Sequence, residues 1–181
     1  MAMQHWVALL RGINVGGNNL IPMADLRGLC AGLGWADVRT YIASGNLVFR
    51  AEGEADGFAT ALGQAIAAQM GCDVPIIVLP GAAVRAALAA CPFDPAAGKM
   101  VHGFVLWADP VVDHVALDRL RAATEQVVVL GRVAWLYAPD GIGRSKLAEK
   151  FGQVVTGTQM TGRNLNTWHK LVEMLDAGAA A

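Results

Sequence analysis

The chain has little charge and no long apolar run. Charged residues make up 16% of its 181 residues, the formal net charge is −1, and hydrophobic residues make up 55%. This composition supplies ample material for a core, whereas the near-neutral charge disfavours a broad nucleic-acid surface and leaves only a local basic site open. No stretch approaches the roughly 18 apolar residues of a membrane span, and Arg11 ends the apolar run near the N-terminus. We therefore expect no membrane partner and no signal peptide.

Cysteine is scarce as well. Cys30, Cys72 and Cys91 form an odd, scattered set without CxxC spacing. Such a set, with no export signal, is typical of the reducing cytoplasm, where these residues fill core space.

Conventional catalytic sets are also missing. The four histidines show no HxxxH or metal-ligand spacing, no GxSxG elbow occurs, and no two carboxylates stand out as an acid–base pair. The sequence therefore assigns no catalytic residue, no metal and no cofactor.

What is present is a strand-like run followed by a loop rich in glycine and asparagine. The apolar residues 7–10 precede RGINVGGNN at 11–19. Glycine permits positive φ and close approach, and asparagine tolerates the left-handed region while bonding locally. A loop of this kind serves either an unusual turn or a ligand.

Hydrophobic periodicity predicts an α+β fold made of two tandem ferredoxin-like (split βαβ) subdomains with mainly antiparallel sheets. The predicted domains are residues 1–80, a short helix and linker at 81–98, and residues 99–181. In the first domain the elements follow the order β-α-β-β-α-β, with strands at 7–10, 38–42, 47–49 and 76–79 and helices at 22–33 and 56–70. A helix at 82–90 follows. The second half repeats the order, with strands at 104–107, 127–130, 133–137 and 154–156, helices at 113–123, 145–151 and 166–175, and a frayed tail after Asp176.

Three predicted strands are apolar at every position, namely 7–10, 76–79 and 127–130. A half-exposed antiparallel sheet alternates apolar and polar residues, so these runs predict sheets covered on both faces, by each other or by a second chain. A homodimer is therefore one of the two arrangements that the sequence allows. Nothing resembles the exposed aromatics of an RNA-recognition sheet.

Three segments carry a family resemblance: LLRGINVGGNN at 9–19 with IPM after it, VRTYIASGNLVF at 38–49, and GIGRSKL at 141–147 together with TGRNLNT at 161–167. They resemble the bacterial domain-of-unknown-function 1697 family of uncharacterised proteins. The resemblance implies an α+β fold with two subdomains and no established activity. Asn19 stands where a lysine is common, Ala43 where a glutamine is common, and Gly162 interrupts a TxRN run. Loss of the lysine weakens a phosphate-binding argument at the first loop.

Two interpretations of the glycine-rich loop, an anion site and a structural turn, are equally supported by its residue types. Backbone N–H groups at Gly12, Gly16 and Gly17, followed by a helix near Pro22, are typical of an anion site, to which Arg11 would add a charge-assisted contact. Against this, the spacing matches neither the P-loop nor the dinucleotide fingerprint, and asparagines such as Asn14 often only complete a turn.

The other candidates also lie in turns. Ser44 and Asn46 form a hairpin turn, favoured over a ligand role by residue type. We expect that turn and the first loop at opposite ends of neighbouring strands, unless a bulge at Ser44 turns side chains toward the first loop. Ser145 is an expected helix N-cap, with Arg144 and Lys146 beside it as an anion site or a solvated basic turn.

Arg163 and Asn164 precede the last helix, where Asn164 or Thr161 caps the helix or Arg163 pairs with an acidic residue. If the two subdomains face each other, Arg11, Arg144, Lys146 and Arg163 form one basic pocket.

These residues support three hypotheses. The first is a cytoplasmic, non-catalytic module that binds a small anionic ligand such as a nucleotide or a nucleic-acid end. The second is an enzyme of unknown reaction with the same pocket, which predicts a titratable group of perturbed pKa in a cleft. The third is a structural or oligomerising protein whose glycine loops shape an interface.

Overall fold

A computed structural model describes residues 2–179 and divides them into two compact units. Unit 1 holds residues up to Ala86 together with residues from Lys170 onward, and unit 2 holds Ala87–His169. Two helices, α3 (Gly81–Ala89) and α7 (Leu165–Ala179), contribute residues to both units.

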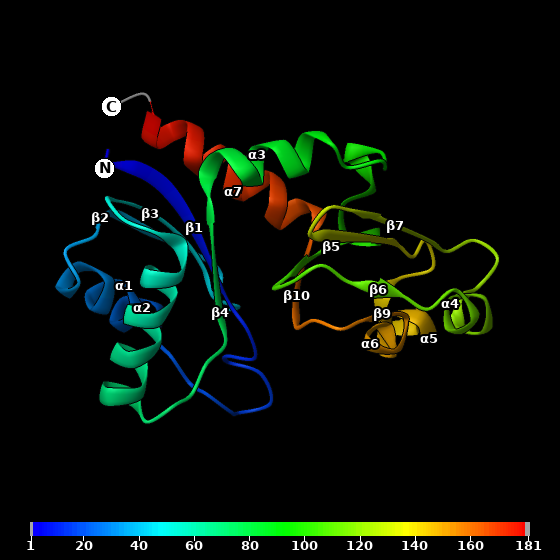
Figure 1. Ribbon diagram of the computed structural model, residues 1–181, viewed down its shortest axis with the longest axis horizontal. Helices are drawn as coiled ribbons and strands as arrows, with labels where there is room; N and C mark the ends of the chain where they lie inside the picture. The colour runs from blue at the N-terminus through cyan, green and yellow to red at the C-terminus, as the bar shows by residue number, and fades with distance from the viewer. Residues whose placement is uncertain (1, 180–181) are drawn as a thin grey trace. The chain divides into compact units, whose positions relative to one another are not determined.

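Unit 1 is an antiparallel four-stranded sheet with two helices on one face (Figure 1). Its strands lie in the order β2-β3-β1-β4, and α1 precedes β2 while α2 precedes β4. The bounds are β1 Gln4–Leu10, α1 Met23–Gly32, β2 Ala36–Tyr41, β3 Asn46–Ala51, α2 Ala55–Met70 and β4 Ile76–Pro80.

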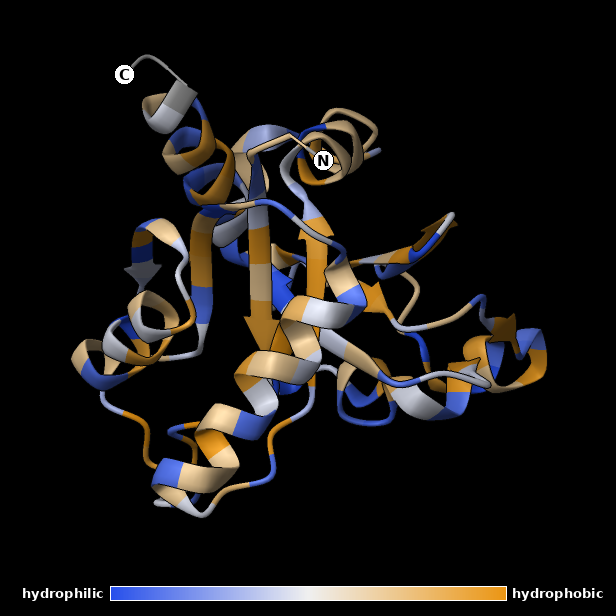
Figure 2. Cartoon of the chain, turned by 60° about the vertical axis from the view of Figure 1, so that its left-hand side comes forward, coloured by the Kyte–Doolittle hydropathy of each residue, from blue (hydrophilic) through white to orange (hydrophobic). Residues whose placement is uncertain are grey.

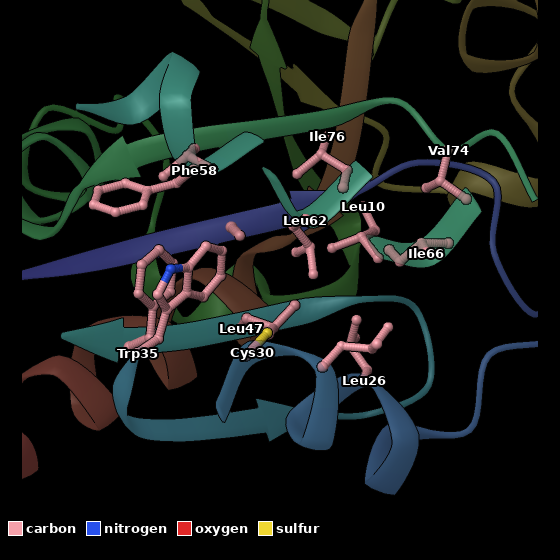
Figure 3. Packing of buried hydrophobic residues seen from close by; sticks show 14 of the residues in the cluster. Leu10, Leu26, Cys30, Trp35, Leu47, Phe58, Leu62, Ile66, Val74 and Ile76 are labelled. Carbon is pink, nitrogen blue, oxygen red and sulfur yellow. The ribbon is translucent and has the colours of Figure 1, made fainter. Parts of the chain in front are cut away.

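The core of unit 1 lies between this sheet and the helices. Alternate residues of β1, namely Trp6, Ala8 and Leu10, belong to this core, because successive strand side chains point to opposite faces. Figure 3 shows Leu10 beside Leu62 and Ile66 of α2. Trp35 stacks on Phe49 with ring centroids 4.0 Å apart. This packing fixes the end of β1, from which the glycine-rich loop departs.

Unit 2 contains a second antiparallel four-stranded sheet, in the order β10-β5-β8-β7, and a two-stranded ribbon of β6 and β9. The strands are β5 Val101–Leu106, β6 Val111–Val112, β7 Gln126–Leu130, β8 Val133–Tyr137, β9 Val155–Thr156 and β10 Met160–Asn164. The helices are α4 His114–Leu120, α5 Lys146–Glu149 and α6 Phe151–Val154, with 3₁₀ turns at Pro95–Met100 and Ile142–Arg144.

Two cores flank the second sheet. On one face Leu106, Leu136 and Phe151 belong to a buried apolar cluster. On the other, Trp168 of α7 lies 5.0 Å from Trp135 between ring centroids and donates its Nε1–H to the Gly103 carbonyl. A Cβ at Gly103 would come within 2.6 Å of both tryptophans, so glycine is required for this close approach.

The α+β class with antiparallel sheets is confirmed. The four strands of the large sheet follow one another along the chain and lie across the sheet in an equivalent order in unit 1 and in unit 2. This order is consistent with the ferredoxin-like description, which stays a prediction. The strand β10 was not predicted, because its sequence, MTGRN, lacks an apolar pattern. The predicted helix 113–123 ends at Leu120, and the predicted helix 145–151 is two short helices that meet at Lys150.

The compact units differ from the predicted chain-ordered domains at their ends. Leu175 of α7 lies beside Gly81 of unit 1, where a Cβ would be 2.9 Å from its Cδ2. Helix α7 continues beyond Asp176, where fraying was expected, and residues 180–181 lie outside the described residues. The predicted helix at 82–90 is α3, and the linker after it is partly helical, since a 3₁₀ turn begins at Pro95.

The prediction of strands covered on both faces holds for β1, holds only in part for β4, where Ile77 and Leu79 are half-buried, and fails for β7. Val7 and Leu9, which point away from the unit 1 core, are as buried as their neighbours, and the long strands at the centre of Figure 2 are mostly orange. In β7 the three valines are half-buried and Leu130 is exposed, because β7 is the last strand of its sheet.

Candidate functional site

Asn14 organises the glycine-rich loop that leaves β1. Its Oδ1 accepts from the Ile21 N–H at 2.8 Å, and its Nδ2 donates to the carbonyls of Ile21 at 3.0 Å and Ala43 at 2.8 Å. Its own φ of +53° is left-handed, which asparagine tolerates better than most residues. These contacts support the interpretation of Asn14 as a turn residue that satisfies the backbone.

The tip of the same loop is a tight turn at Gly16 and Gly17. Both have positive φ, and the Asn18 N–H donates to the Val15 carbonyl at 3.0 Å, which is the pattern of a type I′ turn. The Asn19 side chain donates to the Gly12 carbonyl at 3.1 Å. The loop is therefore held by its own side chains and presents its tip to solvent.

The expectation that this loop and the 43–46 turn lie at opposite ends of neighbouring strands is wrong. Strands β1 and β3 are antiparallel, with Leu9 opposite Asn46, so the end of β1 meets the start of β3. The Leu10 N–H donates to the Gly45 carbonyl at 2.9 Å, and Asn14 reaches Ala43. Both candidate loops of unit 1 thus form one surface.

Asn46 closes the 43–46 turn from within. Its side chain is fully buried and its Nδ2 donates to the Tyr41 carbonyl at 2.9 Å and to the Ser44 Oγ at 3.0 Å. Asn46 thereby fixes the conformation of Ser44, which lies at half-buried depth on the same turn.

Arg11 stands at the base of this surface. Its backbone N–H is bonded to the Pro75 carbonyl at 2.9 Å, while its side chain is exposed. Among residues 2–179 its guanidinium has neither a hydrogen bond nor an ion pair. Arg11 is therefore a cation with a fixed backbone and an uncommitted charge.

Sequence reasoning missed three exposed apolar side chains on these loops. Val15 is 64%, Leu20 66% and Ile42 52% exposed. Ile42 also has φ +47°, which is rare for a β-branched residue. The left-handed backbone of Ile42 could not be predicted from the sequence, since isoleucine at the end of a strand pattern ordinarily indicates an extended backbone.

In unit 2 the predicted cap at Ser145 is present. The Ser145 Oγ accepts from the Ala148 N–H at 2.9 Å and starts α5. Arg144 and Lys146 are exposed on either side and line a shallow hollow together with Glu149. Neither cation has a side-chain partner within the described part of the chain.

Arg163 and Asn164 are more deeply placed. Arg163 is 8% exposed, and its Nη1 donates to the Thr161 Oγ1 and the Gly162 carbonyl, both at 2.8 Å. Burial lowers the pKa of Arg163 to about 10, which leaves it charged at neutral pH. The Asn164 Oδ1 accepts from the Thr167 N–H at 3.0 Å and so caps α7, which agrees with the capping alternative.

The predicted residues therefore fall into two groups. Arg11, Gly12, Asn14, Gly16, Gly17, Ser44 and Asn46 belong to one surface of unit 1, whereas Arg144, Lys146, Arg163 and Asn164 belong to unit 2. Convergence of the two groups on one pocket stays a prediction.

Apart from Arg163, the titratable groups with shifted pKa values lie outside the candidate residues. Burial lowers the pKa of His102, and burial together with the charges of Arg50, Arg85 and Arg39 lowers the pKa of His5. Burial raises the pKa of the Cys91 thiol, which lines a small apolar hollow with His169. A raised thiol pKa disfavours the nucleophilic thiolate. Within residues 2–179 no cluster of three or more metal-ligating side chains is formed, and no helix has the length and apolarity to cross a membrane.

The family model described as a protein of unknown function (DUF1697) matches residues 3–135. The chain belongs to the DUF1697 family. The matched range includes the glycine-rich loop and the 43–46 turn. No curated protein sequence matches this DUF1697 chain.

The DUF1697 fold also has a solved counterpart. The conserved bacterial protein SP0830 from Streptococcus pneumoniae is similar with a TM-score of 0.73 and 25% sequence identity. The similarity covers 96% of this chain and 99% of SP0830, so both units have counterparts in it.

Proposed function

We propose that this chain is a cytoplasmic binding protein for a small anionic ligand, such as a nucleotide or another phosphate-bearing molecule, and that Arg11 supplies the main charged contact. The observation that supports the proposal is the exposed Arg11 guanidinium, which has no partner among the described residues and stands on a backbone held by Pro75. An arginine without an internal partner keeps all five donors for an anion.

The asparagines support the proposal indirectly. The side chains of Asn14 and Asn19 donate hydrogen bonds to backbone carbonyls of the loop, so the loop has its shape before a ligand binds. A preformed loop lowers the entropy that binding must overcome. In this proposal Asn14 and Asn46 position the surface of unit 1 and Arg11 contacts the ligand, while Arg144 and Lys146 of unit 2 are a second candidate anion contact that is tested separately.

The test is a thermal-shift and calorimetric screen of the full chain against nucleotides, phosphosugars and short oligonucleotides. Ligand at about 100 times its dissociation constant adds about 2.7 kcal/mol to the free energy of unfolding. We expect Arg11→Ala to abolish the shift and to leave the stability of the free protein unchanged. Arg27→Ala is the matched control, because Arg27 is an exposed arginine of the same unit that is committed to Thr40 at 2.6 Å.

Two further variants separate charge from architecture. Asn14→Ala removes three hydrogen bonds and should lower the free energy of unfolding by about 1–3 kcal/mol even without ligand. Arg144→Ala tests whether the cations of unit 2 bind an anion. If no anion shifts the unfolding of the wild type, or if Arg11→Ala binds as the wild type does, the proposal is wrong.

A second candidate is a role in assembly, in which the same loops contact another protein. The exposed side chains of Val15, Leu20 and Ile42 favour it, since apolar residues gathered on loops mark interaction surfaces. It predicts that Arg11→Ala alters association and leaves the binding of every small anion unchanged.

A further inference from the structure

We propose that β7 (Gln126–Leu130) pairs with β7 of a second copy of this chain, antiparallel, so that two four-stranded sheets of unit 2 become one eight-stranded sheet. This inference concerns a surface separate from the proposed anion site and does not depend on it. β7 is the last strand in the order β10-β5-β8-β7, so one of its sides has no strand neighbour.

The edge of β7 lacks the features by which proteins protect sheet edges. Exposed edges invite pairing with another chain unless charges, prolines or bulges interrupt them. The edge strand β2 carries Asp37 and Arg39 and a register shift, β4 ends at Pro80, and β10 carries Arg163. The sequence of β7, QVVVL, contains none of these devices.

The side chains and backbone of β7 are correspondingly underused. Leu130 is 42% exposed and the three valines are only half-buried, although valine and leucine are ordinarily core residues. The backbone of β7 pairs with β8 from Gln126↔Tyr137 to Leu130↔Val133, and within residues 2–179 no hydrogen bond reaches its outer side. A second strand would bond these groups and cover the valines.

The sequence of the strand favours its own copy as the partner. In an antiparallel pair related by a two-fold axis at Val128, Val127 faces Val129 of the other copy and Gln126 faces Leu130. Apolar and neutral side chains then meet throughout, and no like charges are opposed. The edge offers nothing to a charged partner beyond its main-chain groups, whereas β-branched residues directly opposite each other stabilise a strand pair.

The test is sedimentation equilibrium of the full chain from about 1 µM to 1 mM, a range that brackets weak and moderate association. We expect the apparent mass to double with concentration, since a five-residue strand pair makes a small interface. Gln126→Lys with Leu130→Lys places like charges opposite each other twice across the axis, and should raise the dissociation constant by about tenfold or more. Both positions are exposed, so the fold should tolerate the change.

A charge swap tests the register itself. Gln126→Glu with Leu130→Lys places opposite charges across the axis and should restore the dissociation constant to within about threefold of the wild type. Along one strand the two positions are about 13 Å apart, beyond the Debye length at physiological salt, so the rescue reports on the partner copy.

Val111→Lys is the matched control, because Val111 is 65% exposed on the separate ribbon of β6 and β9. It should leave the dimer unchanged. A wild type that stays monomeric to 1 mM overturns the proposal, and so does a dimer that survives the two lysines. Failure of the charge swap to restore association overturns the proposed register and with it the two-fold pairing at Val128.

Discussion

Ile42 is a β-branched residue in a backbone conformation that is unfavourable for its side chain. Its φ of +47° lies in the left-handed region, which is unfavourable for L-residues by roughly 1–2 kcal/mol and most of all for β-branched ones. Its side chain recovers little of this by burial, since it is 52% exposed. The turn that contains it is fixed from both sides, by Asn46 on the Tyr41 carbonyl and by Asn14 on the Ala43 carbonyl. Strain that persists in so constrained a turn is characteristic of functional loops.

Ile42→Asn should raise the free energy of unfolding by about 1 kcal/mol, because asparagine adopts the left-handed region at lower cost. Urea denaturation measures the change as a higher midpoint with an unchanged slope. Val111→Asn, at an exposed valine in an ordinary strand, should stay within about 0.5 kcal/mol of the wild type. An unstabilised Ile42→Asn chain would show that the turn is relaxed. If the same variant loses binding or association, the strain has a functional use.

At the scale of elements, β5 and α7 meet through a single glycine. Gly103 has Trp135 and Trp168 over its Cα, and each would come within 2.6 Å of an added Cβ. Both tryptophans are almost fully buried, so neither can move aside. Gly103→Ala should therefore lower the free energy of unfolding by about 1–3 kcal/mol, the usual cost of overpacking.

The matched control for Gly103→Ala is Gly152→Ala in α6. Outside its chain neighbours and the backbone of its own helix, Gly152 has no atom within 4 Å of an added Cβ, and alanine in a helix gains about 0.5–1 kcal/mol over glycine. Urea unfolding followed by tryptophan fluorescence measures both variants. A loss of stability in both, or in neither, would contradict the packing argument.

Elements with strong periodicity could be predicted from the sequence, and the others could not. The helix at 55–70 and the strands at 76–80 and 133–137 were placed within a few residues, because each combines an apolar pattern with a clear stop such as Gly71. β10 was missed because Gly162 and Arg163 look like loop residues. They sit in a strand because Gly162 leaves room for the Phe104 ring and Arg163 bonds to Thr161 and the Gly162 carbonyl.

For the candidate site, the local roles of single residues could be predicted from the sequence, whereas the loops that lie next to each other in the fold could not. The cap at Ser145 was expected from residue type and is confirmed, and of the two caps that the sequence left open for the last helix, Asn164 is the one that forms. The adjacency of the first loop and the 43–46 turn was predicted wrongly, because it depends on the antiparallel pairing of β1 with β3. Pairing between distant strands is set by tertiary packing, to which local patterns are blind.

At the scale of the whole molecule, each unit contains one histidine that burial keeps from protonating easily. His5 of unit 1 and His102 of unit 2 both have lowered pKa values, with burial as the main cause. The Nε2 of His5 and the Nδ1 of His102 are buried without a hydrogen-bond partner among the described residues. Protonation of the His102 ring is opposed by burial. Protonation of the His5 ring is opposed by burial and by the charges of Arg50, Arg85 and Arg39, which a backbone hydrogen bond at Gly178 only partly offsets.

Stability should therefore fall as the pH falls below about 6.5, the ordinary histidine pKa. Between that value and the lowered folded pKa, the unfolded chain binds more protons than the folded chain, so the free energy of unfolding rises with pH across this window. Above it both states hold neutral histidines and the histidine contribution is constant. Urea midpoints measured from pH 5 to pH 8 should show this slope. His5→Gln with His102→Gln should flatten it, whereas His114→Gln, at an exposed residue, should leave it unchanged. A slope that survives the double substitution would assign the acid sensitivity to carboxylates instead, and would remove the buried histidines as the groups that couple both units to pH.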